Sequence, residues 1–341
     1  MYFPELLGND ALKERMGRLV RVGRLPHALI LEGGRGTGKR FFARQLAAAL
    51  LCRHSADSEK PLPCMECPSC RKALEGKSPD VRYLAREDNK TSIGVDPVRD
   101  LRKDMFLSAT EGEKKVYIIE DAHTMTIPAQ NALLIVLEEP PANVHIILTA
   151  ESREALLTTS RSRAQLARMC LLTKEQLATF AKSQPAISQL MKTKPEAYEE
   201  ALLAAMGSAG ELLSLADRSQ MSALLSTREN VYRLLNALAD RQGLGAVLEC
   251  VKAMSGKRKD MSQSLSSLLL ALRDLCLIDK DENAPLLFYT NREYAKRHAN
   301  TFGGRRLHVI YHVVQDAMES LEYNANLNLL QTGLATALVS G

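Results

Sequence analysis

The sequence contains no tryptophan, and aromatic residues fill only 5% of its 341 positions. Leucine and alanine must then supply much of the core, a composition that favours helices. The chain also lacks any uncharged apolar run long enough to cross a bilayer. Residues 1–20 show no charged start followed by an apolar stretch, so the sequence predicts no signal peptide. We therefore expect a cytoplasmic protein with no membrane segment.

The charge balance is that of an ordinary globular protein. Charged residues make up 25% and hydrophobic residues 45%, with a formal net charge of +5. Such a mildly basic surface permits contact with nucleic acid but does not argue for it. Four arginines recur at near-helical spacing close to the N-terminus, and we expect them to form a solvated face: Arg15, Arg18, Arg21 and Arg24.

Strand and helix patterns alternate in the first part of the chain and give way to helices in the rest. Short apolar runs typical of buried parallel strands occur at 27–33, 114–122 and 144–150, and helical spacing at 9–23 and 128–138. From about residue 170 the chain is rich in leucine and alanine with helical periodicity. The predicted fold class is an α/β module with a parallel sheet, followed by all-helical parts.

The turn after the first strand has a phosphate-loop sequence that is intact until its last position. The pattern G-x-x-x-x-G-K-[ST] is met by Gly33, Gly38 and Lys39, with Gly36 inside the loop, but Arg40 replaces the Ser or Thr. That hydroxyl normally ligates Mg²⁺, whereas a guanidinium cannot ligate a cation and would repel one. The loop therefore indicates a nucleotide-binding fold that has lost the means to hydrolyse.

Two further charged elements follow predicted strands. Glu120 and Asp121 end the strand VYII, where an Asp-Glu pair would hold Mg²⁺ and polarise water in a hydrolase, but here the order is reversed. The alternative is an acidic strand end that faces solvent. The segment SRSRAQ at 160–165 is either surface charge or an arginine finger supplied to a neighbouring subunit's phosphate.

Four of the seven cysteines cluster with the spacing C-x11-C-x2-C-x2-C: Cys52, Cys64, Cys67 and Cys70. Four thiolates at this spacing suit a tetrahedral structural Zn²⁺ site with no open position for catalysis. The alternative is four unrelated buried thiols. The other three cysteines are isolated on apolar helical patterns and are expected to be small core residues.

These features resemble the AAA+ clamp-loader subunits of bacterial DNA polymerase III, in particular the delta-prime type. The resemblance rests on HALILEGGRGTGK, the cysteine module, VYIIEDAHTM, NALL-x-x-LEEPP, SRSR, GSAGELL and LEYNANLNLL. It implies a RecA-like P-loop module over 1–166 with a zinc insertion at 50–75. A helical lid over 167–210 and a helical collar over 211–341 would follow, the collar joining five subunits in an open ring.

Departures from the family pattern favour a subunit that is not catalytic itself. An ATP-hydrolysing gamma or tau subunit should have Ser or Thr at 40, Asp-Glu at 120–121 and a lid arginine where Gly210 stands. All three are altered together. The resemblance thus implies weak or no Mg²⁺ binding, and it leaves open whether ATP or ADP binds.

By the same resemblance, Ser162 and Arg163 match the pair whose arginine enters the adjacent ATP site, although Ala164 stands where cysteine is usual. The implied partners are gamma/tau and delta subunits in a hetero-pentamer, with the sliding clamp and primer-template DNA bound through the complex. Two alternatives stay open. One is an ATP-hydrolysing gamma/tau-type motor, because Lys39 and the glycines could still cradle phosphates. The other is a zinc-dependent nucleic-acid binder, for which a basic face with interleaved aromatics is lacking.

Overall fold

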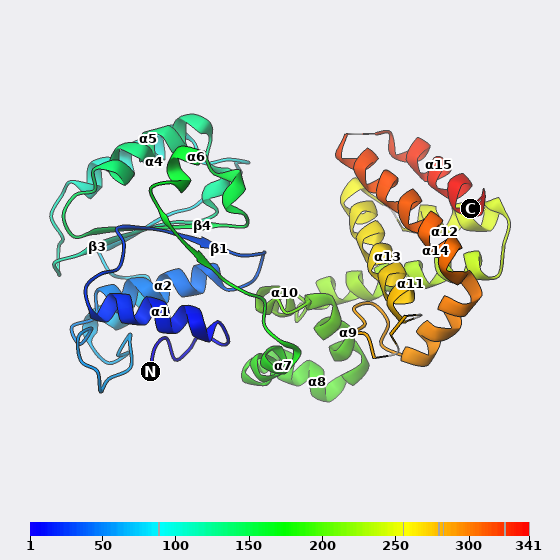
Figure 1. Cartoon of the computed structure of the whole chain (residues 1–341), viewed down its shortest axis with the longest axis horizontal. Helices are drawn as coiled ribbons and strands as arrows, with labels where there is room; N and C mark the ends of the chain where they lie inside the picture. Colours follow the sequence, from blue (N-terminus) through cyan, green and yellow to red (C-terminus); the bar gives the residue numbers. More distant parts are fainter. Residues whose placement is uncertain (88, 255, 279, 282, 324, 341) are drawn as a thin grey trace. The chain divides into compact units, whose positions relative to one another are not determined.

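The computed structural model describes residues 1–87, 89–254, 256–278, 280–281, 283–323 and 325–340 (Figure 1). Asn324, within the late LEYNANLNLL motif, lies outside these residues. The chain divides into two compact units. The first comprises Met1–Phe180 with Gly207–Gly210, and the second comprises Ala181–Met206 with Glu211–Gly341.

A five-stranded parallel sheet forms the centre of the first unit, as the alternating pattern predicts. Its strand order is β2-β3-β4-β1-β5. Ile30 of β1, an interior strand, pairs with Leu148 of β4 on one side and Leu166 of β5 on the other. The strands are β1 (Ala28–Glu32), β2 (Val81–Leu84), β3 (Lys115–Ile119), β4 (Val144–Ala150) and β5 (Gln165–Arg168). All four strand pairs are parallel, so the carboxyl ends of the strands lie at the same edge of the sheet.

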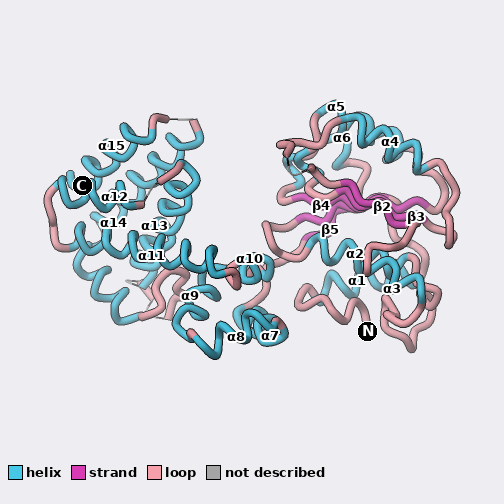
Figure 2. The backbone as a smooth tube through the Cα atoms, turned by 180° about the vertical axis from the view of Figure 1, so that it is seen from behind, coloured by secondary structure: helices cyan, strands magenta, loops and turns pink. Residues whose placement is uncertain are grey.

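Helices cover both faces of this sheet (Figure 2). One face carries α1 (Asp10–Arg21), α2 (Lys39–Leu50) and α3 (Pro68–Leu74). The other carries α4 (Val95–Met105), α5 (Ile127–Glu138) and α6 (Thr158–Arg161). Successive strand residues point to opposite faces. Leu29 and Leu31 therefore join the core under α2, whereas Ile30 joins the core under α5. Burial on both faces explains why β1, β3 and β4 read as continuous apolar runs.

The regular secondary structure of the second unit is all helical over the residues that are described. It contains α8 (Pro185–Thr193), α9 (Pro195–Ala205), α11 (Arg218–Ala239), α12 (Leu244–Ala253), α13 (Arg258–Ile278), α14 (Arg292–Glu322) and α15 (Leu327–Ser340). Two helices run across the unit boundaries, α7 (Lys174–Ser183) and α10 (Ala209–Ser214). Helix α13 is long and apolar enough to cross a membrane by length and composition, but half of that window is buried against its neighbours. It supplies the centre of the helical core.

A buried carboxylate organises the loop before α14. Asp274 on α13 is fully buried and accepts hydrogen bonds from the backbone N–H groups of Leu287, Phe288 and Tyr289 at 2.7–3.1 Å. Arg273 contacts the same carboxylate at 2.8 Å. Because these donors replace lost water, the buried charge is compensated and the loop is tied to the helical core.

Candidate functional site

The phosphate loop joins β1 to α2 at the carboxyl edge of the sheet. Gly36 and Gly38 have positive φ of 71° and 90°, which glycine adopts without strain. Lys39 is buried, and its Nζ donates to the carbonyl oxygens of Gly33 at 2.7 Å and Gly34 at 2.8 Å. Burial lowers the pKa of Lys39, against the opposing effects of nearby carboxylates. The amine is thus already bound by its own loop.

Arg40 lies between the two acidic residues that follow β3. Its Nε is 3.0 Å from Glu120 Oε2, and its Nη2 donates to Asp121 Oδ2 at 2.6 Å. Glu120 is nearly buried, with 9% of its side chain exposed, whereas 56% of the Arg40 side chain is exposed. Burial alone would lower the pKa of Arg40, but the hydrogen bond to Asp121 and the charges of both carboxylates raise it. The guanidinium contacts both carboxylates and offsets one of their two negative charges.

The loop is also closed by a segment far away in sequence. Gly210 N donates to Gly36 O at 2.8 Å, and Ser208 Oγ donates to Arg35 O at 3.1 Å. A Cβ placed on Gly210 would lie 2.7 Å from Gly36 Cα, closer than side chains approach a backbone. Position 210 therefore cannot hold any side chain unless the loop moves. The sequence reveals the glycine but not this contact.

The residues present do not fit the Mg²⁺–nucleotide complex that a phosphate loop implies. No hydroxyl stands at position 40, and the carboxylates that would face a metal are bound by Arg40. Lys39 is bound to loop carbonyls, and Gly210 covers Gly36. The sequence prediction that Arg40 opposes a cation therefore has a geometric basis, and the reversed acidic pair does not simply face solvent.

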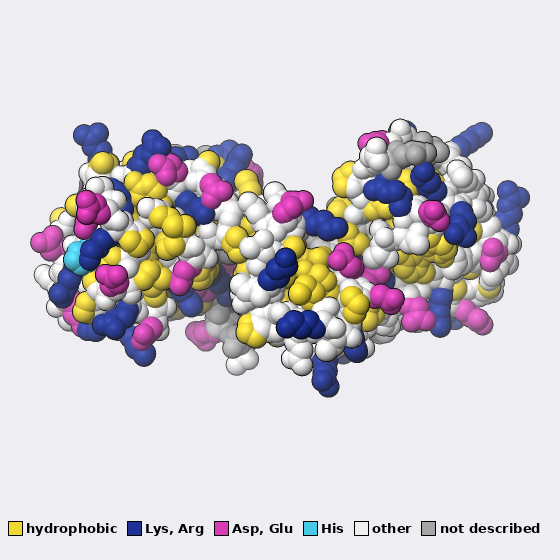
Figure 3. Space-filling view, turned by 90° about the horizontal axis from the view of Figure 1, so that it is seen from below, with side chains coloured by type: hydrophobic (Ala, Val, Ile, Leu, Met, Phe, Trp, Pro, Cys, Tyr) yellow, Lys and Arg dark blue, Asp and Glu magenta, His cyan; other side chains and the backbone are white. Residues whose placement is uncertain are grey.

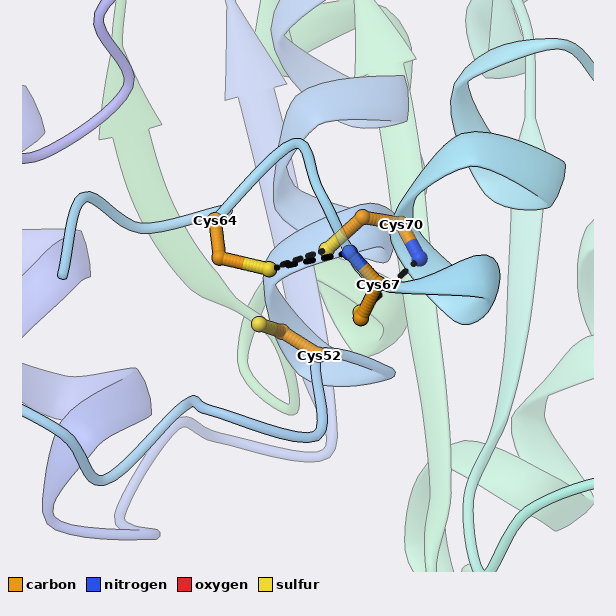
Figure 4. A group of neighbouring side chains, drawn as sticks. All are labelled: Cys52, Cys64, Cys67 and Cys70. Atoms are coloured by element: carbon orange, nitrogen blue, oxygen red, sulfur yellow. Dashed lines mark hydrogen bonds between the residues drawn. The ribbon is translucent and has the colours of Figure 1, made fainter.

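The four clustered cysteines meet where α2 ends and α3 begins (Figure 4). All four are buried, and their sulfur atoms lie within 4.8 Å of one another. The sulfurs of Cys64 and Cys70 are 3.8 Å apart. Tetrahedral zinc with bonds of about 2.3 Å sets its sulfur ligands about 3.8 Å apart. The donor set and spacing therefore fit a structural zinc ion, held by Cys52, Cys64, Cys67 and Cys70.

Backbone contacts prepare these thiols to act as thiolates. The N–H groups of Cys67 and Cys70 donate to the sulfurs of Cys64 and Cys67, both at 3.4 Å. A hydrogen bond from Cys70 lowers the pKa of Cys52, and the same pairing raises the pKa of Cys70. Four sulfurs this close cannot all ionise without a cation, so a bound metal would resolve the conflict.

Arg21 holds the segment that separates Cys52 from the other three cysteines. Its guanidinium donates to the carbonyl oxygens of Ser55, Asp57 and Lys60, with the Lys60 contact at 2.6 Å. It also lies 5.2 Å from the centre of the Tyr2 ring. The expectation that the α1 arginines form a solvated face is therefore wrong for Arg21. It serves the cysteine module instead.

Arg163 follows α6 on the opposite face of the sheet from the cysteine module, and 35% of its side chain is exposed. Its Nη1 donates to Thr159 O at 2.9 Å and to Ser162 Oγ at 3.2 Å. Its Nη2 is 2.7 Å from Glu138 Oε1 at the end of α5. Arg163 is thus accessible yet held in place, and Ser162 helps to hold it. Glu138 lies in the LEEPP segment of the sequence, but the motif does not reveal its contact with Arg163.

Gln130 on α5 secures the segment that leads to α6. Its buried side chain accepts from Leu157 N at 2.8 Å and donates to Met125 O at 3.3 Å. The start of α5 follows the acidic pair by a few residues. A single amide therefore ties the region after β3 to the arginine-bearing turn.

Lysine and arginine do not gather into one large patch on the face drawn in Figure 3, where they are interspersed with acidic side chains. In the basic run GKRK at 256–259, Arg258 donates to the carbonyl oxygens of Leu321 and Ala325, so this arginine stabilises the fold. The face drawn in Figure 3 thus shows no concentrated basic surface of the kind that binds nucleic acid.

Comparison with known proteins places the chain in a family. The family description "DNA polymerase III, delta subunit" matches residues 8–172. The DNA polymerase III subunit tau of Salmonella typhimurium is 30% identical over 263 residues, covering 75% of this chain and 39% of the relative. The chain belongs to the clamp-loader family of AAA+ proteins. The tau subunit of Bacillus subtilis is 28% identical over 288 residues, with coverage of 81% and 50%.

The clamp-loader chain therefore spans half or less of the length of these two curated relatives. Among solved structures, a gamma subunit-related protein of Thermotoga maritima aligns with a TM-score of 0.46 and 17% identity, covering 95% of this chain and 98% of that one. The RuvB branch-migration motor of the same organism aligns at 0.41 and 14% identity, with coverage of 82% and 78%. Both of these curated relatives are tau subunits.

Proposed function

We propose that this chain is a delta-prime-type subunit of the DNA polymerase III clamp loader. In this role it supplies Arg163 in trans to the ATP site of a neighbouring subunit and does not hydrolyse ATP itself. The observation that carries the proposal is the contact of Arg40 with Glu120 and Asp121. A guanidinium on both carboxylates leaves the metal of a hydrolytic site without ligands.

The trans role is supported by where Arg163 lies. Its side chain is partly exposed and its contacts are with Glu138, Thr159 and Ser162, none of which belongs to the phosphate loop. An arginine placed at a subunit edge can stabilise the charge that develops on a neighbour's transferring phosphoryl group. Fingers of this kind contribute roughly 10³- to 10⁵-fold in rate.

The remaining assignments follow from this proposal. Gamma/tau and delta subunits would complete a hetero-pentamer in the cytoplasm, which meets the sliding clamp and primer-template DNA as a complex. Residues 1–166, 167–210 and 211–341 would serve as AAA+ module, lid and collar. Zinc on the four cysteines would hold the insertion at 50–75 in shape, since Arg21 alone binds only one of its loops.

The second candidate is an ATP-hydrolysing gamma/tau-type motor. It is favoured by the retained Gly33, Gly36, Gly38 and Lys39, and by the tau subunits among the relatives. In its disfavour, Lys39 and Arg40 are already bound within the chain.

Steady-state ATP turnover separates the two. The purified chain with Mg²⁺, primed DNA and sliding clamp should be silent. It should raise turnover when it completes a mixture of its species' gamma/tau and delta subunits. Turnover by the isolated chain, abolished by Lys39→Ala, would establish the motor instead.

A further inference from the structure

The guanidinium of Arg163 is fixed by acceptors from two separate helical segments. Glu138 ends α5, and its Oε1 lies 2.7 Å from Arg163 Nη2. Thr159 O on α6 and the neighbouring Ser162 Oγ accept from Nη1. Both terminal nitrogens are therefore held, and from different directions. This is more restraint than a flexible surface arginine ordinarily has.

The Glu138–Arg163 pair contributes little to folding. The side chains are 49% and 35% exposed, and ion pairs this exposed are weakened by solvent and salt. The buried amide of Gln130 already secures the turn that leads to α6. The carboxylate of Glu138 therefore restrains the side chain of Arg163, whereas the backbone of this turn is held by Gln130.

We propose that Glu138 is a positioning residue for Arg163, an inference that rests on the proposed trans-acting role. Its carboxylate fixes the orientation of the guanidinium before a neighbour's phosphate arrives. The five N–H groups of a guanidinium exceed the three acceptors it has here, so the arginine can keep Glu138 while it donates to phosphate oxygens. Ordering the side chain in advance removes a cost that would otherwise fall on the catalytic step.

The first test uses the reconstituted complex. Glu138→Gln should lower its kcat roughly 3- to 30-fold, a part of the ~10²-fold that loss of accurate positioning costs. The KM for ATP should change little, because the ATP site belongs to the neighbour. Glu138→Asp should recover part of the loss. The matched control is Glu139→Gln, the adjacent and likewise exposed carboxylate, which should leave turnover unchanged.

A double-mutant cycle excludes a general structural effect. In an Arg163→Ala background, Glu138→Gln should change kcat no further. If it lowers turnover as much without Arg163 as with it, Glu138 does not act through the arginine. If Glu138→Gln instead raises turnover, the carboxylate competes with phosphate for the finger, and the positioning role is also overturned.

A second test needs no ATPase. In the full chain with ¹⁵N-labelled arginine, the Nη groups of Arg163, assigned through Arg163→Lys, should rotate slowly in the wild type and rapidly in Glu138→Gln. Equal rotation in both would contradict the contact itself. If Arg163→Ala leaves turnover of the complex unchanged, the proposed function fails. The NMR result then still decides whether Glu138 holds Arg163.

Discussion

Replacing Arg40 with methionine should destabilise the first unit, because it leaves two carboxylates without their cation. Exposed ion pairs are worth about 0–1 kcal/mol, and breaking a fully buried pair costs about 3–5 kcal/mol. Glu120 is 9% exposed and Asp121 32%, so this site lies between those limits. We expect a loss of about 1–2 kcal/mol, or roughly 3–6 °C in the Tm of a unit of this size.

The assay is thermal unfolding of the full chain, followed by a probe of the α/β unit. Arg44→Met is the matched control: Arg44 is on the same helix, exposed, and lies over the Tyr83 ring. It should cost less than Arg40→Met. Adding Glu120→Gln to Arg40→Met should recover much of the loss, since the orphaned charge is then gone. An Arg40→Met protein as stable as the wild type would show that the contacts of Arg40 with the two carboxylates do not stabilise the first unit.

Arg40 should also determine whether the phosphate-loop site binds Mg²⁺. Arg40→Thr restores the hydroxyl that the phosphate-loop pattern requires and frees Glu120 and Asp121. Mg²⁺ with ATP should therefore raise the Tm of Arg40→Thr, by mass action, and leave the wild-type Tm unchanged. An equal rise in both proteins would show that Arg40 does not exclude the metal.

Three further predictions concern the surrounding structure. Removing zinc with a strong chelator should release one ion per chain, measured by elemental analysis, and lower the Tm of the first unit; no released zinc would contradict the site. Gly210→Ala should reduce the stability of the first unit by about 1–3 kcal/mol, because its Cβ would meet Gly36 at 2.7 Å. Gly94→Ala, in the same unit and with no atom within 4 Å, should cost less. The carboxylate of Asp104 accepts hydrogen bonds from Tyr117 at 2.7 Å and Lys115 at 3.0 Å. Burial would raise the pKa of Asp104, but these donors lower it, so the charged carboxylate stabilises the fold above the ordinary Asp pKa. That stabilisation is lost as pH falls through the lower folded-state pKa, so the Tm difference between wild type and Asp104→Asn should shrink from pH 6 to pH 3; a constant difference would contradict this prediction.

The strands that could be predicted are those buried on both faces. β1, β3 and β4 are continuous apolar runs, and α1, α2 and α5 show helical spacing or follow a recognisable turn. β2 and β5 are four residues long and lie at the two edges of the sheet. In β5, Gln165 and Arg168 are exposed, so the strand has neither an apolar run nor a clear alternation. Its place is set by pairing with β1, which local sequence does not encode.

In the candidate site, too, some features could be predicted from the sequence and others could not. Residue types with a chemical constraint were predictable: the glycines and Lys39 of the loop, the four cysteines, and Arg40 as a misfit for metal. The contacts of Arg21 with the cysteine module, of Gly210 with Gly36, and of Glu138 with Arg163 were not. The first two join residues dozens or more positions apart, and all three depend on how elements pack. Charge and spacing alone cannot distinguish such a contact from a solvated surface.

The proposed action of Arg163 on a neighbour's ATP site can be tested with a single substitution. Arg163→Ala should leave the chain folded and able to assemble with gamma/tau and delta subunits, checked by thermal unfolding and size-exclusion chromatography. The DNA-stimulated ATPase of that complex should nonetheless fall by roughly 10³-fold or more at the site it serves. The matched control is Arg153→Ala, whose arginine pairs with the adjacent Glu154, and it should have no such effect. Unchanged hydrolysis by an intact Arg163→Ala complex would show that Arg163 does not act on a neighbour's ATP site.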